Sequence, residues 1–377
     1  MTDIGKRIIM TQALDKKTLI KLLDTWLALL IEKNGTDLHI KSKAPVKARI
    51  KGEIISLSDT LVQKNTIKAL VHLLTGDKYK SFEEDKEFDG TYITDKQDRF
   101  RINIYSHYNG LALNFRIIPQ HIKTLEELNL PSALHKLAKL QRGLVLITGT
   151  TGSGKSTLLS SVIEEINQNS NKHIISIEDP IEFVYIDKKS IIEQRELGTH
   201  THSFANALRS AMREDPDIIV VGEIRDIDTA ESILQAVNTG HLVFSTVHTL
   251  DAKETIDRMV SIFPTGEQNR IRTTLAATIE AIISQRLVKG IDGNMIPAVE
   301  MMFRSALVQD LIRTKRDSEI LDVIEKEGHS FDSISFNQSL FNLTLEGKIS
   351  EKKAYQYATN VSDLRLMFNL SEEYTQK

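Results

Sequence analysis

One short run of glycines, hydroxyl residues and a lysine has the composition needed to hold the phosphates of a nucleotide. Residues 149–156 read GTTGSGKS and match the pattern G-x-x-x-x-G-K-S/T. Glycines let backbone N–H groups close around phosphate oxygens, and the start of a following helix adds partial positive charge. We expect Lys155 to reach the β- and γ-phosphates of ATP and the Ser156 hydroxyl to bind Mg²⁺.

The segments on both sides of this run have the patterns that a P-loop requires. Gly143–Thr148 is an apolar run typical of a buried parallel strand, and Lys155–Asn167 has apolar residues at helical spacing. A chance match or a plain glycine-rich turn would lack this context. The predicted nucleotide-binding residues of the loop are Gly149, Thr150, Thr151, Gly152, Ser153, Gly154, Lys155, Ser156 and Thr157.

Two further apolar runs end in carboxylates. Ile174–Ile177 leads into Glu178, and Ile218–Val221 leads through a glycine into Glu223. Alternating strands and helices predict an α/β fold with a parallel sheet, whose ligands bind at the carboxyl ends of the strands. We expect Glu178 to position or deprotonate the attacking water and Glu223 to hold the metal.

A fourth strand is expected over residues 241–246, and a histidine lies near each of its ends. Either His241 or His248 could sense the γ-phosphate from such a position. A buried histidine with a purely structural role is the alternative for each of them.

A hairpin in the first third of the chain carries two arginines on one face. Asn109-Gly110 is a dipeptide favoured in type I′ turns. A tight turn there pairs Ile102 with Ile117 on a buried face and leaves Arg101 and Arg116 diagonal to each other on the opposite face. The two arginines could form an anion site for phosphate, and a solvated strand face is the alternative.

Composition limits the class of protein. A chain of 377 residues with 41% apolar content can bury a full core and is expected to form two or three domains. The absence of cysteine excludes disulfides and thiolate metal sites and fits a reducing cytosol. The longest apolar stretch, Trp26–Ile31, is too short to span a bilayer, so a soluble intracellular protein is expected. A net charge of -3 argues against a general nucleic-acid-binding surface.

Several ordered motifs resemble those of one ATPase family. Its Asp box, Walker B motif and His box are similar to four runs of this chain, residues 177–183 (IEDPIEF), 213–217 (REDPD), 222–226 (GEIRD) and 239–249 (TGHLVFSTVHT). Residues 36–39 (TDLH) match near the start of the chain. These motifs resemble the type IV pilus and type II secretion ATPases, and within them the PilT and PilU retraction branch.

The resemblance implies a domain arrangement and a working assembly. It implies an N-terminal PAS-like α/β domain over 1–119, a linker over 120–132, and a RecA-like ATPase domain over 133–377 whose C-terminal region, from about 268, is helical. It also implies a homo-hexamer that hydrolyses ATP with Mg²⁺. Such a motor works in the cytoplasm at the pilus base, beside an inner-membrane platform protein.

The resemblance also implies roles for individual residues. Glu178 matches the Asp-box catalytic glutamate, Glu223 the Walker B glutamate, and His248 the functional His-box histidine. Arginines of the family's N-terminal domain approach the phosphates. This favours the anion-site interpretation of Arg101 and Arg116, with Arg99 as a weaker third candidate.

The branch within the family rests on smaller features. Assembly and secretion ATPases usually carry a longer N-terminal region and a four-cysteine zinc site, which disfavours pilus assembly as the function here. The segment Ala306–Ile312 departs from the PilT motif Ala-Ile-Arg-Asn-Leu-Ile. Three stretches look more PilU-like: Pro297–Glu300, Gln309–Ile312 and Asp363–Leu366. Independent retraction and an accessory role beside a PilT-type partner therefore both stay open.

Two other function classes also stay open. A RecA-like ring could translocate nucleic acid, but the chain shows no cluster of basic residues interleaved with aromatics that such a channel needs. A regulatory subunit that binds nucleotide without hydrolysing it is disfavoured by the intact Lys155, Glu178 and Glu223.

Overall fold

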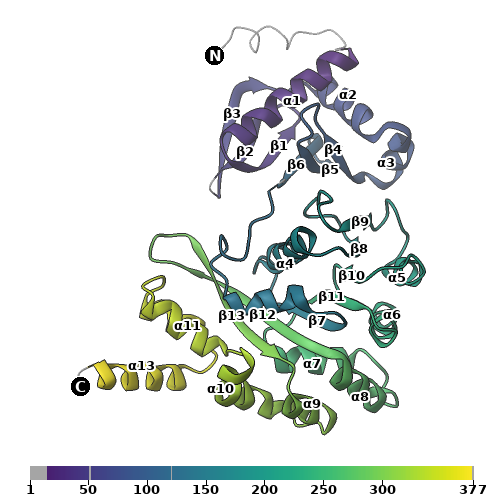
Figure 1. Cartoon of the computed structure of the whole chain (residues 1–377). Helices are drawn as coiled ribbons and strands as arrows, with labels where there is room; N and C mark the ends of the chain where they lie inside the picture. Colours follow the sequence, from purple (N-terminus) through teal and green to yellow (C-terminus); the bar gives the residue numbers. More distant parts are fainter. Residues whose placement is uncertain (1–14, 51, 120, 376–377) are drawn as a thin grey trace. The chain divides into compact units, whose positions relative to one another are not determined.

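The computed structural model describes residues 15–375 apart from residues 51 and 120. Within these residues the chain folds as two compact units, with the boundary between Gln120 and His121 (Figure 1). Each unit has its own sheet and its own buried core. Each therefore has the properties of a structural domain.

The first unit is an antiparallel sheet with helices packed on it. Its described strands pair in the order β3-β2-β1-β6-β5-β4. Its elements are α1 (Lys16–Glu32), β1 (Gly35–Lys41), β2 (Pro45–Ile50), β3 (Glu53–Leu61), α2 (Lys64–Thr75), η1 (Gly76–Lys78), α3 (Tyr79–Asp85), β4 (Glu87–Ile93), β5 (Arg99–His107) and β6 (Gly110–Ile118).

Helix α1 shows how the sequence builds this unit. Asp15 caps the helix by accepting a hydrogen bond from the Thr18 N–H at 2.8 Å. Apolar residues then recur every three or four positions and form the face that packs on the sheet. The buried residues of α1 are Leu19, Leu23, Trp26, Leu27 and Leu30.

The turn between β5 and β6 differs from the predicted one. Tyr108 and Asn109 form the turn, and His107 pairs with Gly110. The positive φ, +130°, belongs to Gly110, which already lies in β6. The turn is therefore centred one residue earlier than the Asn109-Gly110 dipeptide indicates.

This shift corrects the predicted pairing but keeps the predicted faces. Ile102 pairs with Phe115 rather than with Ile117, and Arg101 lies directly opposite Arg116 rather than diagonal to it. The register has moved by two residues, which is the period at which side chains alternate between faces. The two arginines consequently share one face, as expected.

The second unit is built around a seven-stranded sheet of the described residues, with the order β13-β12-β7-β11-β10-β8-β9. All neighbours from β12 to β9 are parallel, and β13 is antiparallel to β12. Its strands are β7 (Gly143–Thr148), β8 (His173–Glu178), β9 (Ile191–Glu196), β10 (Ile218–Val221), β11 (Leu242–Val247), β12 (Ile279–Lys289) and β13 (Met295–Phe303).

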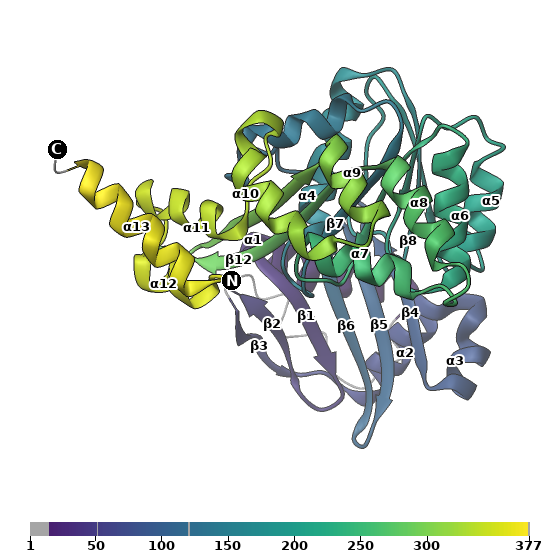
Figure 2. The ribbon, with the colours of Figure 1, turned by 90° about the horizontal axis from the view of Figure 1, so that it is seen from below.

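Helices cover both faces of this sheet (Figures 1 and 2), so the central strands β7, β10 and β11 are buried along their whole length. One face packs on α4 and η2, and the other on α5 to α10. The helices are η2 (Ser132–Lys139), α4 (Lys155–Asn169), α5 (Phe204–Ala211), α6 (Ile227–Asn238), α7 (Ala252–Ser261), α8 (Gln268–Thr278), α9 (Ala306–Arg313), η3 (Asp317–Glu319), α10 (Ile320–Phe331), α11 (Phe336–Leu345), α12 (Glu351–Tyr357) and α13 (Val361–Thr375).

The C-terminal region is not helical throughout, which corrects the expectation for residues from about 268 onward. Residues 279–303 supply β12 and β13, two long strands that extend the sheet. Their runs of Ile, Val and Met favour buried strands over helices. Helices α11 to α13 pack together beyond the far ends of these strands, on a separate cluster that includes Val288, Ile296 and Leu340 (Figure 2).

The segment expected to be a linker is packed rather than free. Leu125 and Leu130 are buried against Leu134 and Leu137 of η2 in the core on the α4 side. Residues 121–132 therefore belong to the packed second unit.

His135 joins this segment to helix α4. Its Nδ1 lies 2.8 Å from a Glu165 carboxylate oxygen on α4, and its Nε2 lies 2.9 Å from Glu126. The hydrogen bond to Glu165 is the main cause that raises the pKa of His135. The protonated imidazole can donate to both carboxylates at once, so the contact is strongest when His135 is charged.

Among the residues that the structure describes, no helix is both long enough and apolar enough to cross a lipid bilayer.

The His135 contact predicts a pH-dependent stability. Because the folded-state pKa of His135 is raised, its stabilisation is present below the unfolded value of about 6.5 and is lost as the pH rises through the folded value. His135→Gln should therefore lower the melting temperature by about 2–4 °C at pH 6 and by much less at pH 9. Thermal melts at both pH values measure this difference.

His121→Gln is the matched control, since His121 lies 3.4 Å from Glu127 but its side chain is 75% exposed. It should change the melting temperature little at either pH. Equal losses for His135→Gln at pH 6 and pH 9 would contradict the assignment.

Candidate functional site

The P-loop follows β7 and leads directly into α4, as predicted. Its glycines Gly149, Gly152 and Gly154 have φ angles of +144°, +78° and +90°, which side-chain-bearing residues rarely adopt. A Cβ atom on Gly149 would lie 2.4 Å from the Ser153 hydroxyl and 2.5 Å from the Gln285 backbone oxygen. Only glycine fits this close packing, which shapes the loop for phosphate.

Lys155 curls back over the loop. Its ammonium donates hydrogen bonds to the backbone oxygens of Gly149 at 2.7 Å and Thr150 at 3.0 Å. Burial lowers the pKa of Lys155, and the nearby carboxylates of Glu223 and Glu182 oppose this shift. The P-loop lysine and the Walker B carboxylate therefore belong to one electrostatic site.

Gln285 on β12 supports the P-loop, although the P-loop motif does not include this residue. Its amide donates to the Ser153 backbone oxygen at 2.7 Å, and a Cβ on Gly154 would come within 2.5 Å of the same amide nitrogen. The Ser153 hydroxyl is buried without a hydrogen-bond partner among the described residues. A buried hydroxyl in this loop fits a group that donates to a bound phosphate.

Glu178 ends β8 and is held in place by three donors. One carboxylate oxygen accepts from the Ser176 hydroxyl at 2.6 Å and from Gln194 at 3.1 Å, and the other accepts from the Glu182 N–H at 3.4 Å. Burial raises the pKa of Glu178, and these hydrogen bonds only partly offset it. A carboxylate with a raised pKa and a fixed orientation suits general-base work on water. Its partner Gln194 lies on the edge strand β9, where no motif indicates it.

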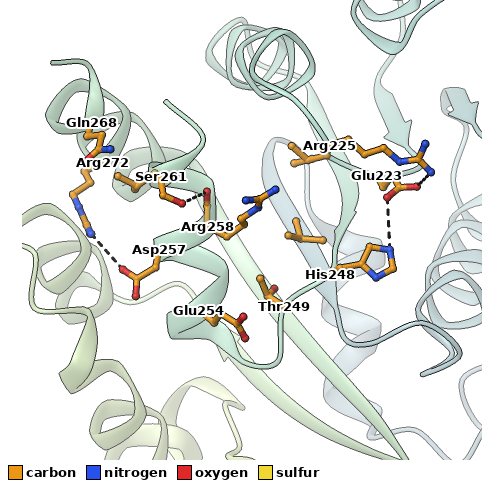
Figure 3. A pocket seen from close by; sticks show the side chains of 13 residues that line it. Glu223, Arg225, His248, Thr249, Glu254, Asp257, Arg258, Ser261, Gln268 and Arg272 are labelled. Atoms are coloured by element: carbon orange, nitrogen blue, oxygen red, sulfur yellow. Dashed lines mark hydrogen bonds and ion pairs between the residues drawn. The ribbon is translucent and has the colours of Figure 1, made fainter. Parts of the chain in front are cut away.

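A network of charges joins the strand ends of β8, β10 and β11. Glu223 forms an ion pair with Arg225 and lies 3.6 Å from His248 Nε2, as the dashed lines in Figure 3 mark. Arg225 also contacts Asp179 at 3.0 Å. Arg225 therefore ties the loop after Glu178 to the loop that carries Glu223, a role that sequence reasoning did not assign to it.

A cavity of about 720 Å³ opens beside this network (Figure 3). It extends from the Glu223–His248 pair to helices α7 and α8, from which Arg258 and Arg272 line it. The charged and polar residues around it are Glu223, Arg225, His248, Thr249, Glu254, Asp257, Arg258, Ser261, Gln268 and Arg272.

Ser156 and Glu223 have the oxygen donors that Mg²⁺ prefers. Ser156 lies in the first turn of α4, and Glu223 is close enough to act on Lys155. The described residues contain no cluster of three or more His, Asp or Glu side chains that could hold a metal by themselves. The residues fit an ion that is held jointly by these two groups, nucleotide phosphates and water, which is the usual manner for Mg²⁺.

The structure corrects the prediction for His241. His241 precedes β11, whereas the P-loop, Glu223 and His248 follow the opposite ends of their strands. Its Nδ1 contacts the Ala236 backbone oxygen at 2.9 Å and the Thr239 hydroxyl at 3.1 Å. His241 is a structural residue at the edge of the sheet opposite the site. The length of β11, about 20 Å, separates it from the site's edge.

The candidate arginines lie in the first unit. Arg101 is exposed, and the described residues include no ion-pair partner for it. Arg116 donates to Asp37 on β1 at 2.7 Å, with side chains 68% and 12% exposed. Burial alone would raise the pKa of Asp37, but hydrogen bonds from Thr36 and Arg116 lower it. Arg116 therefore has a structural partner, whereas Arg101 does not, and Arg99 pairs in register with Ile118.

Known proteins resemble this chain over most of its length. The family model described as type II/IV secretion system protein matches residues 12–315. The type IV pilus retraction ATPase PilT of Pseudomonas aeruginosa is 38% identical over 333 residues, which cover 88% of this chain and 96% of PilT. The type IV pilus ATPase PilU of the same organism is 35% identical over 349 residues, covering 92% of this chain and 91% of PilU.

A solved structure supports the same relationship. The crystal structure of the pilus retraction motor PilT with bound ADP matches with a TM-score of 0.85 at 37% identity, covering 92% of this chain and 98% of that one. That structure contains bound ADP. The chain is thus an ATP-hydrolysing member of the PilT/PilU family of type IV pilus ATPases, within the type II/IV secretion superfamily.

Proposed function

We propose that this chain is a homo-hexameric, Mg²⁺-dependent ATPase that powers the retraction of a type IV pilus. The observation that carries the proposal is the convergence of Lys155, Glu178 and Glu223 at one sheet edge, in a chain that aligns with 96% of PilT. The P. aeruginosa relative is named a retraction ATPase, and this supports the same role here.

The residues divide the chemistry between them. The P-loop amides and Lys155 hold the phosphates and offset the charge that develops during phosphoryl transfer. Mg²⁺ held by Ser156 and Glu223 would neutralise the β- and γ-phosphate oxygens. Glu178 orients the attacking water and takes its proton, because it is the carboxylate whose orientation three donors fix. His248, through its contact with Glu223, would respond to the state of the γ-phosphate.

The proposed location is the cytoplasmic side of the inner membrane, at the pilus base, beside a platform protein. No direct nucleic-acid contact is part of the proposal, although a retracting pilus could serve DNA uptake as well as twitching motility. The second possibility, that the chain assists a PilT-type ATPase rather than acting alone, stays part of the proposal, since the chain also aligns with the type IV pilus ATPase PilU over 349 residues.

Deletion of the gene, followed by counts of surface pili and by a twitching assay, tests the role in the cell. We expect more surface pili and less twitching, because pili would extend without being withdrawn. Bald cells would indicate an assembly ATPase instead. If a strain that lacks only the PilT-type partner cannot retract when this chain is overproduced, the chain is an accessory subunit.

Glu178→Gln tests the assignment of the general base. The variant keeps the shape of the side chain and should bind Mg-ATP normally, while its turnover falls by about 10²-fold or more. Steady-state ATPase assays and nucleotide titrations measure the two properties. Glu193→Gln, an exposed carboxylate on the adjacent strand β9, should hydrolyse ATP at the normal rate. Lost binding in Glu178→Gln would make the residue structural.

Arg101→Ala and Arg116→Ala test the proposal that these arginines act on the bound phosphates. Each should leave hexamers intact by size while lowering kcat by up to about 10³-fold, the scale of an arginine that stabilises transferring phosphate. Arg101→Ala is the cleaner test because, of the two arginines, only Arg116 forms an ion pair, with Asp37, that its substitution would break. Arg116→Ala should in addition lower the stability, because the carboxylate of Asp37 loses its partner.

Mixing Arg116→Ala subunits with Glu178→Gln subunits asks whether sites are completed between neighbouring chains. Some recovered ATPase would indicate completion between chains, and no recovery would indicate completion within one. Normal turnover of both single arginine variants would leave these residues as a solvated strand face.

A further inference from the structure

A buried glutamate lies in the same row of the sheet as the residues that precede the P-loop and His248. Glu300 on β13 is only 3% exposed. It pairs with Ser284 on β12, Ser284 with Thr148 on β7, and Thr148 with Val247 on β11. Thr148 is followed by the P-loop and Val247 by His248. Glu300 therefore lies in the row of the sheet from which the P-loop and the His248 loop emerge, two strands away from β7, although none of the motifs there contains it.

Glu300 holds the start of helix α7. Its Oε1 accepts a hydrogen bond at 2.9 Å from the N–H of Ala252, the first residue of this helix. No ion pair to Glu300 exists in the part of the chain that the structure describes. A carboxylate at the positive end of a helix, accepting a backbone N–H, anchors that helix more strongly when it is charged.

The start of α7 is in turn fixed to the loop that carries His248. The Thr249 hydroxyl lies 2.7 Å from the Thr255 hydroxyl, which donates to the Asp251 backbone oxygen at 2.6 Å. The Leu250 N–H donates to the Glu254 carboxylate at 2.7 Å. Residues 249–251 are therefore hydrogen-bonded to the first turn of α7, the helix that also supplies part of the cavity wall.

The surroundings of Glu300 allow it to change charge near neutral pH. Burial is the main cause that raises the pKa of Glu300 to about 7. The charged groups that act on it are Asp251 before α7 and Glu325 on α10, which favour the protonated form, and Arg286 on β12, which favours the charged form. Arg286 is held elsewhere, since it stacks on the Phe336 ring at 3.8 Å and donates to the Tyr357 backbone oxygen.

We propose that Glu300 is a positioning residue for ATP hydrolysis: its carboxylate anchors the start of α7 and the loop that carries His248, and protonation of Glu300 loosens both. This inference rests on the proposed ATPase function. It adds Glu300 of β13, about 50 residues further along the chain, to the groups that hold the His248 loop, and it makes this contact depend on a proton.

Amide exchange of the full-length protein tests the anchor without using activity. At pH 8, the peptide over residues 248–256 should exchange several-fold faster in Glu300→Gln and more than 10-fold faster in Glu300→Leu than in the wild type. Glu346→Gln, which removes an exposed carboxylate paired with Lys348, should change nothing there. If Glu300→Leu does not fold, the isosteric Glu300→Gln still decides. Unchanged protection of this peptide in Glu300→Gln would overturn the proposal.

The pH profile of hydrolysis tests the proton. In the wild type, kcat should fall by roughly 5-fold from pH 8 to pH 6 with an apparent pKa of about 7, while KM for ATP changes little. Glu300→Gln should show the low kcat at both pH values and lose this inflection, because its side chain stays neutral. A pH profile of Glu300→Gln that matches the wild type in both kcat and inflection would overturn the proposal. If the wild-type protein did not hydrolyse Mg-ATP, the proposed function would be wrong. The amide-exchange experiment would still test whether Glu300 anchors α7.

Discussion

The in-register pairing of the parallel strands is the constraint on which the candidate site depends. Val221 at the end of β10 pairs with Ile177 on β8 and with Ser245 on β11, and Thr148 at the end of β7 pairs with Val247. A polar group of the site lies at the end of each of these strands or soon after it. A slip of one residue would turn every side chain of a strand to the opposite face and draw polar strand ends toward the core, where unpaired polar groups cost about 1–3 kcal/mol each. The packing of the core and the geometry of the site therefore both require the same strand register.

This constraint explains how much the sequence could predict. The P-loop, Glu178 and Glu223 were predicted because each follows an apolar run, and a strand's end is visible in the local pattern. The predicted strand over residues 241–246 already separates His241 from His248, but the motif contains both histidines and does not itself indicate which end of the strand carries the site. Gln285 and Glu300 could not be predicted from any local pattern, since β12 and β13 join the sheet from more than 100 residues beyond the P-loop.

The first unit shows a different limit of sequence reasoning. The alternation of apolar and polar residues in β5 and β6 predicts which face is buried, because that depends only on odd or even position. The pairing of Arg101 with Arg116 depends on which two residues make the turn, and a single glycine sits compatibly in more than one turn geometry. The sequence consequently predicts the fold of this unit better than it predicts the distance between Arg101 and Arg116.

The buried charges of the second unit differ in how they are satisfied. Lys155 donates to two backbone oxygens, Glu178 accepts from a hydroxyl, an amide and an N–H, and Glu300 accepts from the start of a helix. Neutral dipoles are weaker partners than opposite charges, so such groups can exchange them for a phosphate or a proton at small cost. Glu223 is different, because it already forms an ion pair with Arg225 and lies 3.6 Å from His248 Nε2. Any cation that binds Glu223 must compete with Arg225, which also joins the loop after Glu178. Arg225 is therefore the one side chain that contacts both Glu223 and Asp179, the residue that follows the proposed general base Glu178, among the residues that the structure describes.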